Sequence, residues 1–353
     1  MDPAIWSRLP EEILDHILSL LPLKTFMNLR STCKRFDSLI FSPSFISKHS
    51  SAAGAAASPP SLLLLSHPHF PSRVGVYDAA TASWRSIHLS LSSASTSPRA
   101  AATLLSSSNG LFCLRNSSSL LISNFLTKSS RPINFPTFPF DFDSLTLIST
   151  ESGYSIFAHC SRSSFVYSSA AQSWSQFDGF SPALSESCRQ EGVFFRGSLY
   201  FTTQEPIQIV RFDVRTGEWG SMETELPAGI SFARLVSNGE RKLYLVGGVG
   251  NNGISKTVKL WELDGGGDWV EIERLPEMMC RKFVSVCYHN YEHVYCFWHQ
   301  GMICICCYTW PEILYYKVGR RTWHWLPKCP SLPEKWSCGF KWFSFVPQLY
   351  ALV

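Results

Sequence analysis

The chain has 353 residues, enough for one large domain with a small appendage or for two domains. Aromatic residues make up 14% of the chain and charged residues only 16%, which favours many short, half-buried strands over a solvated helical bundle. The net charge of +4 is modest and the basic residues are dispersed, so a nucleic-acid-binding surface of clustered cations is not expected.

The first segment has the periodicity of a helix. Between Leu9 and Leu21 the apolar residues recur every three to five positions, so one helix face is apolar. Pro10 suits the first helical position, and the two glutamates after it complement the positive end of the helix dipole. Pro22 is expected to end this helix.

A second helical stretch follows, and then the composition changes. Phe26, Leu29, Cys33, Phe36 and Ile40 again stand at helical spacing, and Ser42-Pro43 is expected to break the helix. The small and polar residues of 47–61 predict a flexible joint, with the linker proper at 51–60. A second low-complexity stretch, 90–108, predicts a long surface loop.

Beyond residue 60 the sequence is dominated by a repeat. An aromatic residue and a tryptophan seven positions later recur about every 45 to 55 residues, with one interval twice as long. The pairs are Tyr77 and Trp84, Tyr167 and Trp174, Phe212 and Trp219, and Tyr316 and Trp323, with Trp261 and Trp269 one residue further apart.

The long interval predicts a unit that has lost both markers. Residues 123–130 fall in this interval, with Ser130 in the place of the tryptophan, which gives six units in all. Units of this length are typical of propeller blades, because six four-stranded sheets around an axis can bury one another's faces. We expect the tryptophan to fill the wedge against the neighbouring blade. Three Leu-Pro pairs should form turns into the next blade, at 226–227, 275–276 and 326–327.

Residues 248–253 spell G-x-G-x-x-G, the pattern of a dinucleotide-binding loop, with Glu273 at the distance of a ribose-binding acid. That function requires a helix after the third glycine. Alternating apolar residues follow instead, which predicts a strand. We therefore interpret Gly247-Gly248 as the end of one strand of blade five and Asn252-Gly253 as a tight turn.

The most apolar region, 293–316, carries histidines, a proline and a glutamate, so it is expected to form strands and not a membrane helix. Within it, alternation places Cys304 and Cys306 on one strand face. The chain has twelve cysteines, of which Cys304, Cys306 and Cys307 lie in one strand-like run, and we expect reduced core thiols, no metal and no cofactor.

At this point the residues resemble known families. The segment LPEEILDHILSLLPLKTFMNLRSTCKRFDSLIFSPSFI (9–46) resembles an F-box, except that Phe36 stands where that family usually has tryptophan. The remainder is similar to the kelch-type propeller of plant F-box/kelch-repeat proteins, although blade two lacks the aromatic residue and the tryptophan. The expected fold is a small all-α F-box (three-helix cluster) at 1–50, the linker, and a six-bladed, all-β kelch-type propeller at 61–353.

The resemblance implies a non-catalytic substrate receptor of a Skp–cullin–F-box (SCF) ubiquitin ligase. Its partners would be a Skp-type adaptor, through it the cullin and RING subunits, and an unidentified target protein, with no role for nucleic acid or membrane. A helical segment of about 40 residues also rarely folds alone, so its apolar stripe should need a partner or should pack on the propeller. The adaptor-binding residues implied by the resemblance are Leu9, Pro10, Ile13, Ile17, Leu18, Pro22, Leu29, Arg30, Lys34 and Phe36, whereas Leu14 and Leu21 should hold the helices together.

In a four-stranded blade, the loop between the second and third strands shares a face with the connection to the next blade. A substrate peptide could bind there, across the mouth of the channel. Candidate residues on this face are Gln204 and Glu205 in blade four, Asn251 and Asn252 in blade five, Arg281 and Lys282 between blades five and six, and His299 and Gln300 in blade six. Each could equally be an ordinary solvated loop residue.

Other functions have weaker support. Propellers host sialidases and copper oxidases, but the glycine after Asp213 has the wrong spacing for a sialidase motif, and no copper-ligand set or nucleophile elbow is recognisable. A non-degradative scaffold or transcriptional co-regulator is the stronger alternative. The N-terminus shows no secretory signal, so the nucleus, the cytoplasm or both are expected.

Overall fold

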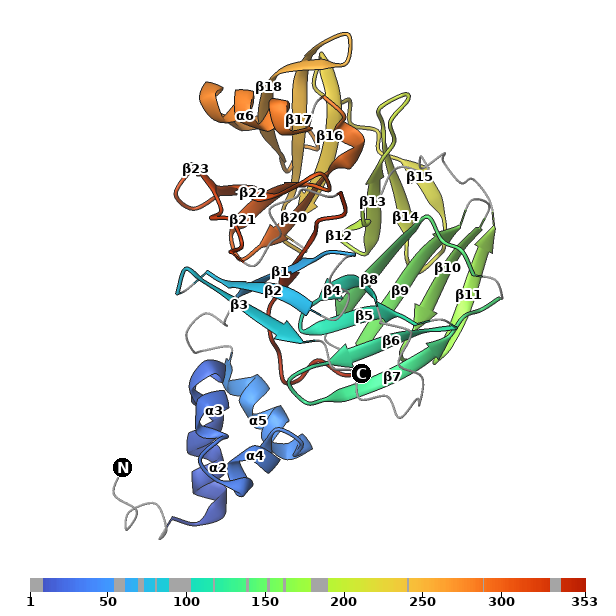
Figure 1. Cartoon of the computed structure of the whole chain (residues 1–353). Helices are drawn as coiled ribbons and strands as arrows, with labels where there is room; N and C mark the ends of the chain where they lie inside the picture. Colours follow the sequence, from blue (N-terminus) through green and yellow to red (C-terminus); the bar gives the residue numbers. More distant parts are fainter. Residues whose placement is uncertain are drawn as a thin grey trace.

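The structure is a computed structural model with a helical domain (residues 9–53) attached to a ring of six β-sheets (Figure 1). It describes residues 9–53, 61–68, 73–79, 81–88, 103–116, 118–137, 140–150, 153–160, 163–178, 190–239, 241–287, 289–330 and 338–353. The predicted six-bladed propeller behind an N-terminal helical region is thus confirmed.

Within residues 9–53 the structure has four helices, whereas the sequence predicted a three-helix cluster. They are α2 (Glu11–Ser19), α3 (Leu23–Leu29), α4 (Lys34–Leu39) and α5 (Pro43–Ala53). The expected second helix is split because residues 30–33 form a turn, after which the Cys33 thiol caps α4 by accepting a hydrogen bond from the Phe36 amide. The expected joint at 47–61 begins late, since α5 continues to Ala53; residues 54–60 lie outside the described part of the chain.

Each blade is a four-stranded antiparallel sheet, and the first strand of each lies innermost. Blade one takes its first strand from the end of the chain, with the order β24 (Lys341–Phe345), β1 (Leu62–Ser66), β2 (Arg73–Asp78), β3 (Ser83–His88). This pairing of β24 with β1 closes the ring.

The other blades follow chain order. Blade two is β4 (Thr103–Ser108), β5 (Leu111–Arg115), β6 (Ser119–Asn124), β7 (Ser129–Asn134), and blade three is β8 (Ser144–Thr150), β9 (Gly153–Cys160), β10 (Ser163–Ser168), β11 (Ser173–Asp178). Blade four is β12 (Val193–Phe195), β13 (Ser198–Thr202), β14 (Ile209–Asp213), β15 (Trp219–Ser221). Blade five is β16 (Ile230–Ser237), β17 (Leu243–Asn251), β18 (Ile254–Leu263), β19 (Trp269–Arg274). Helix α6 (Glu277–Cys287) and the short η1 (Tyr291–His293) lead into blade six, β20 (Val294–His299), β21 (Met302–Cys307), β22 (Trp310–Lys317), β23 (Thr322–Trp325).

The core lies between the blades. Alternate residues of one strand pack on opposite neighbours: Leu63 and Leu65 of blade one face blade six, whereas Leu64 faces blade two. Cys304 and Cys306 likewise face blade one while Cys307 faces blade five, as the alternation predicted. Every sheet therefore buries both faces, which is the physical reason the ring is stable.

The repeated aromatic–tryptophan pair lies on the hairpin of the third and fourth strands. Tyr77 is paired with Trp84 across β2 and β3, with ring centroids 5.2 Å apart. The predicted unit without the aromatic and tryptophan markers is confirmed as blade two. Ser123 and Ser130 face each other across β6 and β7, in the place of the aromatic–tryptophan pair. The predicted long loop at 90–108 is partly wrong, because Thr103–Ser108 form β4; residues 89–102 lie outside the described part.

The glycine motif forms a hairpin, as predicted, but Gly247 and Gly248 lie inside β17 and do not end it. A β-carbon on Gly248 would lie 2.1 Å from Ser255 Oγ and 2.6 Å from the Phe232 ring, so close packing requires a glycine there. Asn252 and Gly253, with φ of 53° and 74°, form the tight turn to β18. The strand that follows excludes the helix that a dinucleotide site would need.

The apolar region 293–316 forms β20, β21 and most of β22, as predicted. Within the described residues, no helix is both long enough and apolar enough to span a bilayer.

Candidate functional site

Helix α2 presents an apolar surface on the outside of the helical domain. Ile13 is 48% exposed and Leu20 is 53% exposed, and the half-buried Ile17 lies between them in sequence. Their spacing of four and three residues places all three on one side of the helix. Pro10 and Pro22, at the two ends of α2, are also exposed. Large exposed apolar side chains grouped in this way are typical of a surface that binds another protein.

The opposite side of α2 belongs to the core of the helical domain. Leu14 and Leu18 pack there with Phe26 of α3 and Phe45 of α5. Leu14 holds the helices together as predicted, and the half-buried Leu21 packs against the same cluster. The prediction for Leu18 is wrong, because this side chain is only 3% exposed and cannot reach a partner.

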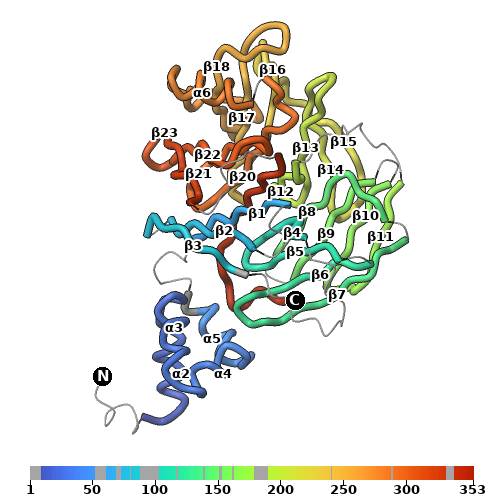
Figure 2. The backbone as a smooth tube through the Cα atoms, viewed as in Figure 1, coloured from blue at the N-terminus to red at the C-terminus, as the bar shows by residue number. Residues whose placement is uncertain are grey.

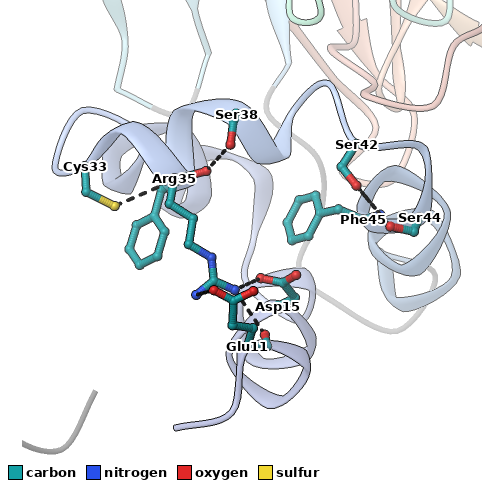
Figure 3. Close-up of polar contacts among 9 residues, drawn as sticks. Glu11, Asp15, Cys33, Arg35, Ser38, Ser42, Ser44 and Phe45 are labelled. Atoms are coloured by element: carbon teal, nitrogen blue, oxygen red, sulfur yellow. Dashed lines mark hydrogen bonds and ion pairs between the residues drawn. The ribbon is translucent and has the colours of Figure 1, made fainter. Parts of the chain in front are cut away.

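Arg35 fixes α4 against α2. Its Nη2 lies 2.8 Å from Asp15 Oδ1 and 3.2 Å from the main-chain oxygen of Glu11, and its Nη1 lies 3.6 Å from the Glu11 carboxylate (Figure 3). A guanidinium group can hold several acceptors at once, so Arg35 sets the angle between the two helices. Sequence reasoning did not single out this residue.

The remaining predicted adaptor-binding residues differ in accessibility. Lys34 is exposed, whereas Leu9, Leu29 and Phe36 are half-buried, the last two against the helical core. Arg30 is half-buried and its Nε lies 3.0 Å from Asp37 Oδ1.

Sequence reasoning missed two exposed apolar residues of the helical domain, Leu20 on the α2 surface and Phe41 just after α4. Leu20 could have been found, because it stands seven residues after Ile13 on the same helix face. Phe41 follows the buried Leu39 and Ile40, and three consecutive apolar residues do not indicate which one faces solvent.

The other end of the helical domain packs on the propeller. Leu349, which follows β24, is 3% exposed and lies within the helical core cluster; Leu126, from the β6–β7 turn, packs against it. Lys24 Nζ of α3 lies 3.4 Å from Asp78 Oδ2 at the end of β2. The tail after β24 passes between the helices and blade two, as the backbone in Figure 2 shows. This contact leaves the α2 surface uncovered.

We call the side of the ring with the second-to-third strand loops the connection face. It also carries the links between blades. The helical domain contacts the opposite face, because Asp78 and Leu126 lie at turns between third and fourth strands. The two candidate binding regions are therefore on different sides of the propeller.

Several predicted substrate-binding residues lie on the connection face. Gln204 and Glu205 are in the loop between β13 and β14, and Asn251 and Asn252 are at the end of β17 and in the turn to β18. Gln204 is half-buried, and the other three are exposed. Whether any of them binds a substrate stays a prediction.

Arg281 and Lys282 lie on helix α6, in the connection from blade five to blade six. Arg281 forms an exposed ion pair with Glu277, one helical turn earlier. Lys282 Nζ lies 2.7 Å from Glu312 Oε2 and 4.0 Å above the centre of the Trp325 ring.

Comparison with known proteins agrees with this geometry. Residues 6–50 match the F-box-like family, and residues 87–261 match the F-box associated beta propeller domain. An F-box/kelch-repeat protein of Arabidopsis thaliana is 52% identical to the chain over 370 aligned residues, which cover 100% of this chain and 90% of the relative. The chain belongs to the F-box/kelch-repeat family.

More distant relatives of this F-box/kelch-repeat chain cover most of its length. The protein ABERRANT PANICLE ORGANIZATION 1 of Oryza sativa subsp. japonica is 27% identical, over 99% of this chain and 90% of its own. The protein UNUSUAL FLORAL ORGANS of Arabidopsis thaliana is 23% identical, over 94% of this chain and 80% of its own. Members of this family are adaptor-type receptors, and the resemblance seen in the sequence is confirmed.

One predicted part of the F-box/kelch-repeat substrate site is misplaced. His299 ends β20 and Gln300 begins the turn to β21, so both lie between a first and a second strand, on the face opposite to the connection face. His299 is also fully buried, with Nδ1 2.8 Å from Ser344 Oγ of blade one. The loop between the second and third strands of blade six is at residues 308–309. The alternating apolar and cysteine residues around it do not indicate where the strands end.

The central channel contains a cavity of about 850 Å³. An ion pair spans it, because Lys341 Nζ of blade one lies 3.3 Å from Glu191 Oε1, just before the first strand of blade four. Ser106 of blade two donates a hydrogen bond to the same carboxylate, 2.5 Å away. Three blades of the F-box/kelch-repeat propeller are thus linked across its axis.

The cysteines of blade six are buried and reduced. Burial raises the pKa of Cys296 to about 12 and also raises that of Cys304, so both remain protonated thiols at neutral pH. The described residues contain no group of three or more side chains that could hold a metal ion.

Proposed function

We propose that this F-box/kelch-repeat protein is the substrate-recognition subunit of an SCF-type ubiquitin ligase. In this proposal the α2 surface docks on a Skp-type adaptor, and through it on the cullin and RING subunits. The connection face of the propeller binds a target protein for ubiquitination and proteasomal degradation. The chain supplies no catalytic residue, since the bound ligase subunits carry out the transfer. The assembly would act in the nucleus, the cytoplasm or both.

The observation that carries the proposal is the exposed apolar side of α2. Folding has already sealed the other end of the helical domain with Leu349, so the propeller cannot also cover Ile13 and Leu20. Exposing them to water is unfavourable by about 25 cal/mol per Å² of apolar area, and a partner would remove that area from solvent. The position of the adaptor surface away from the connection face would leave room for a target there.

The adaptor half is tested with Ile13→Asp combined with Leu20→Asp, in the full chain co-expressed with a Skp-type adaptor. We expect at least about a hundredfold loss of adaptor affinity, because two apolar contacts are removed and two charges would be buried unpaired. The milder pair Leu9→Ala with Pro10→Ala should also abolish co-purification. Ile87→Asp, an exposed position on blade one, is the matched control. Undiminished adaptor binding by the double aspartate variant would reject this assignment.

The degradative half is tested by target half-life. Proteins captured by the propeller under proteasome inhibition, with and without residues 1–50, are its clients. Their half-lives should lengthen when the chain is lost from the cell. Clients whose half-lives stay constant would instead indicate a non-degradative scaffold or co-regulator.

A further inference from the structure

Helix α6 provides a fixed platform on the connection face. Its buried side, formed by Cys280, Phe283 and Cys287, packs into the core shared by blades five and six. The Cys280 thiol also lies 3.8 Å from the main-chain oxygen of Lys256, which ties the helix to the start of β18. Figure 1 shows α6 beside β18, and it is the one α-helix in the described part of the propeller.

Two large apolar side chains beside this platform face solvent. Met278, in the first turn of α6, is 74% exposed, the highest fraction for any large apolar residue in the described part of the chain. Ile254, at the start of β18, is 52% exposed. Neither contributes to a core, although the helix that carries Met278 is held firmly in place. An exposed methionine adapts its shape to different apolar partners.

The surroundings of these two residues carry excess positive charge. Lys256 and Arg281 are exposed, and within the described part of the chain Arg281 forms an ion pair with the exposed Glu277. Glu312 is buried, and its carboxylate serves two ammonium groups, with Lys282 Nζ at 2.7 Å and Lys328 Nζ at 3.5 Å. Among the described residues of this surface, the three cations Lys256, Arg281 and Lys282 are accompanied by two carboxylates, Glu277 and Glu312, which leaves an excess of positive charge.

We propose that the α6 patch, defined as Ile254, Lys256, Met278, Arg281 and Lys282, binds a segment of the target protein in which an apolar side chain is flanked by Asp and Glu residues. The inference rests on the proposed function, since it names the class of target that the propeller recruits. The apolar side chain would cover Met278 and Ile254. The carboxylates would lie against Lys256, Arg281 and Lys282, because opposite charges select the partner and its orientation.

A nucleic acid fits this patch less well than an acidic peptide. Its bases would need aromatic side chains on which to stack, and the exposed anchors Met278 and Ile254 are aliphatic.

The test uses the full chain, co-expressed with a Skp-type adaptor, to select from a random peptide display library. We expect the selected peptides to share acidic residues around one Leu, Ile, Met or Phe. A fluorescein-labelled copy of the strongest binder then serves as the probe in fluorescence anisotropy. Lys256→Glu with Arg281→Glu should weaken its binding by at least about tenfold, and Met278→Ser by about fivefold.

Arg320→Glu is the matched control, because this exposed arginine lies in the turn between β22 and β23, on the opposite face of blade six. It should leave peptide binding unchanged. Adaptor co-purification, measured on the same samples, shows that each variant is folded. It also separates the two proposals: peptide binding should survive Ile13→Asp with Leu20→Asp.

The inference is overturned if the selection yields no binder, or if the selected peptides are basic or share no chemistry. Binding that is insensitive to charge reversal at Lys256 and Arg281 would equally overturn it. So would displacement of the peptide by a single-stranded oligonucleotide at a concentration comparable to that of the peptide, since the patch would then recognise nucleic acid.

Discussion

Leu18 and Leu20 stand two residues apart at the end of α2, yet one is buried and the other is half exposed. A helix advances 100° per residue, so two positions apart they point to widely different directions. Periodicity places them on different faces but does not say which face meets the core, because apolar residues lie on both. Phe26 and Phe45 pack on the Leu18 side of the helix, and this packing determines that Leu18 is buried and Leu20 is exposed.

His299 is a buried base whose charge state should affect the stability of the propeller. Burial lowers the pKa of His299 to about 4, and its Nε2 has no hydrogen-bond partner among the described residues. In the unfolded chain a histidine titrates near pH 6.5. The unfolded state therefore binds more protons between these values, and the folded state loses stability as pH falls through this range.

We expect His299→Gln to reduce this loss. The wild-type free energy of unfolding should fall by about 2 kcal/mol more than that of the variant between pH 7 and pH 5. Glutamine can retain a hydrogen bond to Ser344 and does not titrate. Chemical denaturation at the two pH values provides the measurement. Parallel pH profiles for the two proteins would show that the imidazole is accessible to protons in the native state.

At the level of elements, the hairpin of the third and fourth strands joins each blade to the one before it. Trp84 Nε1 of blade one donates a hydrogen bond to the Pro327 oxygen after blade six, at 3.2 Å. Trp174 of blade three does the same to the Asn134 oxygen of blade two, at 2.9 Å. Trp219 of blade four packs on Phe157 of blade three. The predicted role of the tryptophan, to fill the wedge between blades, is thus correct.

Two substitutions of Trp84 should separate the contribution of its hydrogen bond to stability from that of its ring packing. Trp84→Phe removes the hydrogen bond to Pro327 but keeps an aromatic ring against Tyr77 and Trp342, so a loss of about 1 kcal/mol in the free energy of unfolding is expected. Trp84→Ala also removes the packing and should cost about 3 kcal/mol. Urea denaturation of the three proteins measures both steps. Equal losses for the two variants would mean that the ring packing is unimportant.

On the scale of the whole molecule, the C-terminal segment closes the propeller and links it to the helical domain. Strand β24 closes the ring by pairing with β1, and Lys341 at its start reaches across the channel to Glu191. Beyond the strand, the Asn124 side chain of blade two donates to the main-chain oxygens of Gln348 and Ala351. Leu349 between them enters the helical core. The C-terminal tail therefore contacts the helical domain and holds it in a defined orientation.

Leu349→Ala should loosen the helical domain without unfolding the propeller. The loss of a buried leucine costs about 2–5 kcal/mol, and the cavity would open on the side of Phe26 and Phe45. Hydrogen exchange of the α3 and α5 amides should accelerate, whereas that of β17 should not. Leu352→Ala is the control, because Leu352 is 62% exposed three residues away. Similar acceleration in both variants would mean that Leu349 has no special role.

The local patterns of the sequence determined the helical segment, the number of blades, the place of the degenerate blade and the hairpin nature of the glycine motif. Each depends on contacts between residues that are close in the chain, so periodicity and turn chemistry specify it. The same reasoning also predicted the apolar stripe of α2 and the positions of the second-to-third strand loops of blades four and five.

Long-range packing decided the rest. Three outcomes depend on segments that are far apart in the sequence: the burial of Leu18, the face on which His299 and Gln300 lie, and the docking of Leu349. No local pattern encodes the relative positions of the blades and helices involved. The C-terminal tail covers one apolar side of the helical domain. Only this docking determines that the α2 side remains exposed to a partner. This is because burial is a property of the assembled core and not of any one strand or helix.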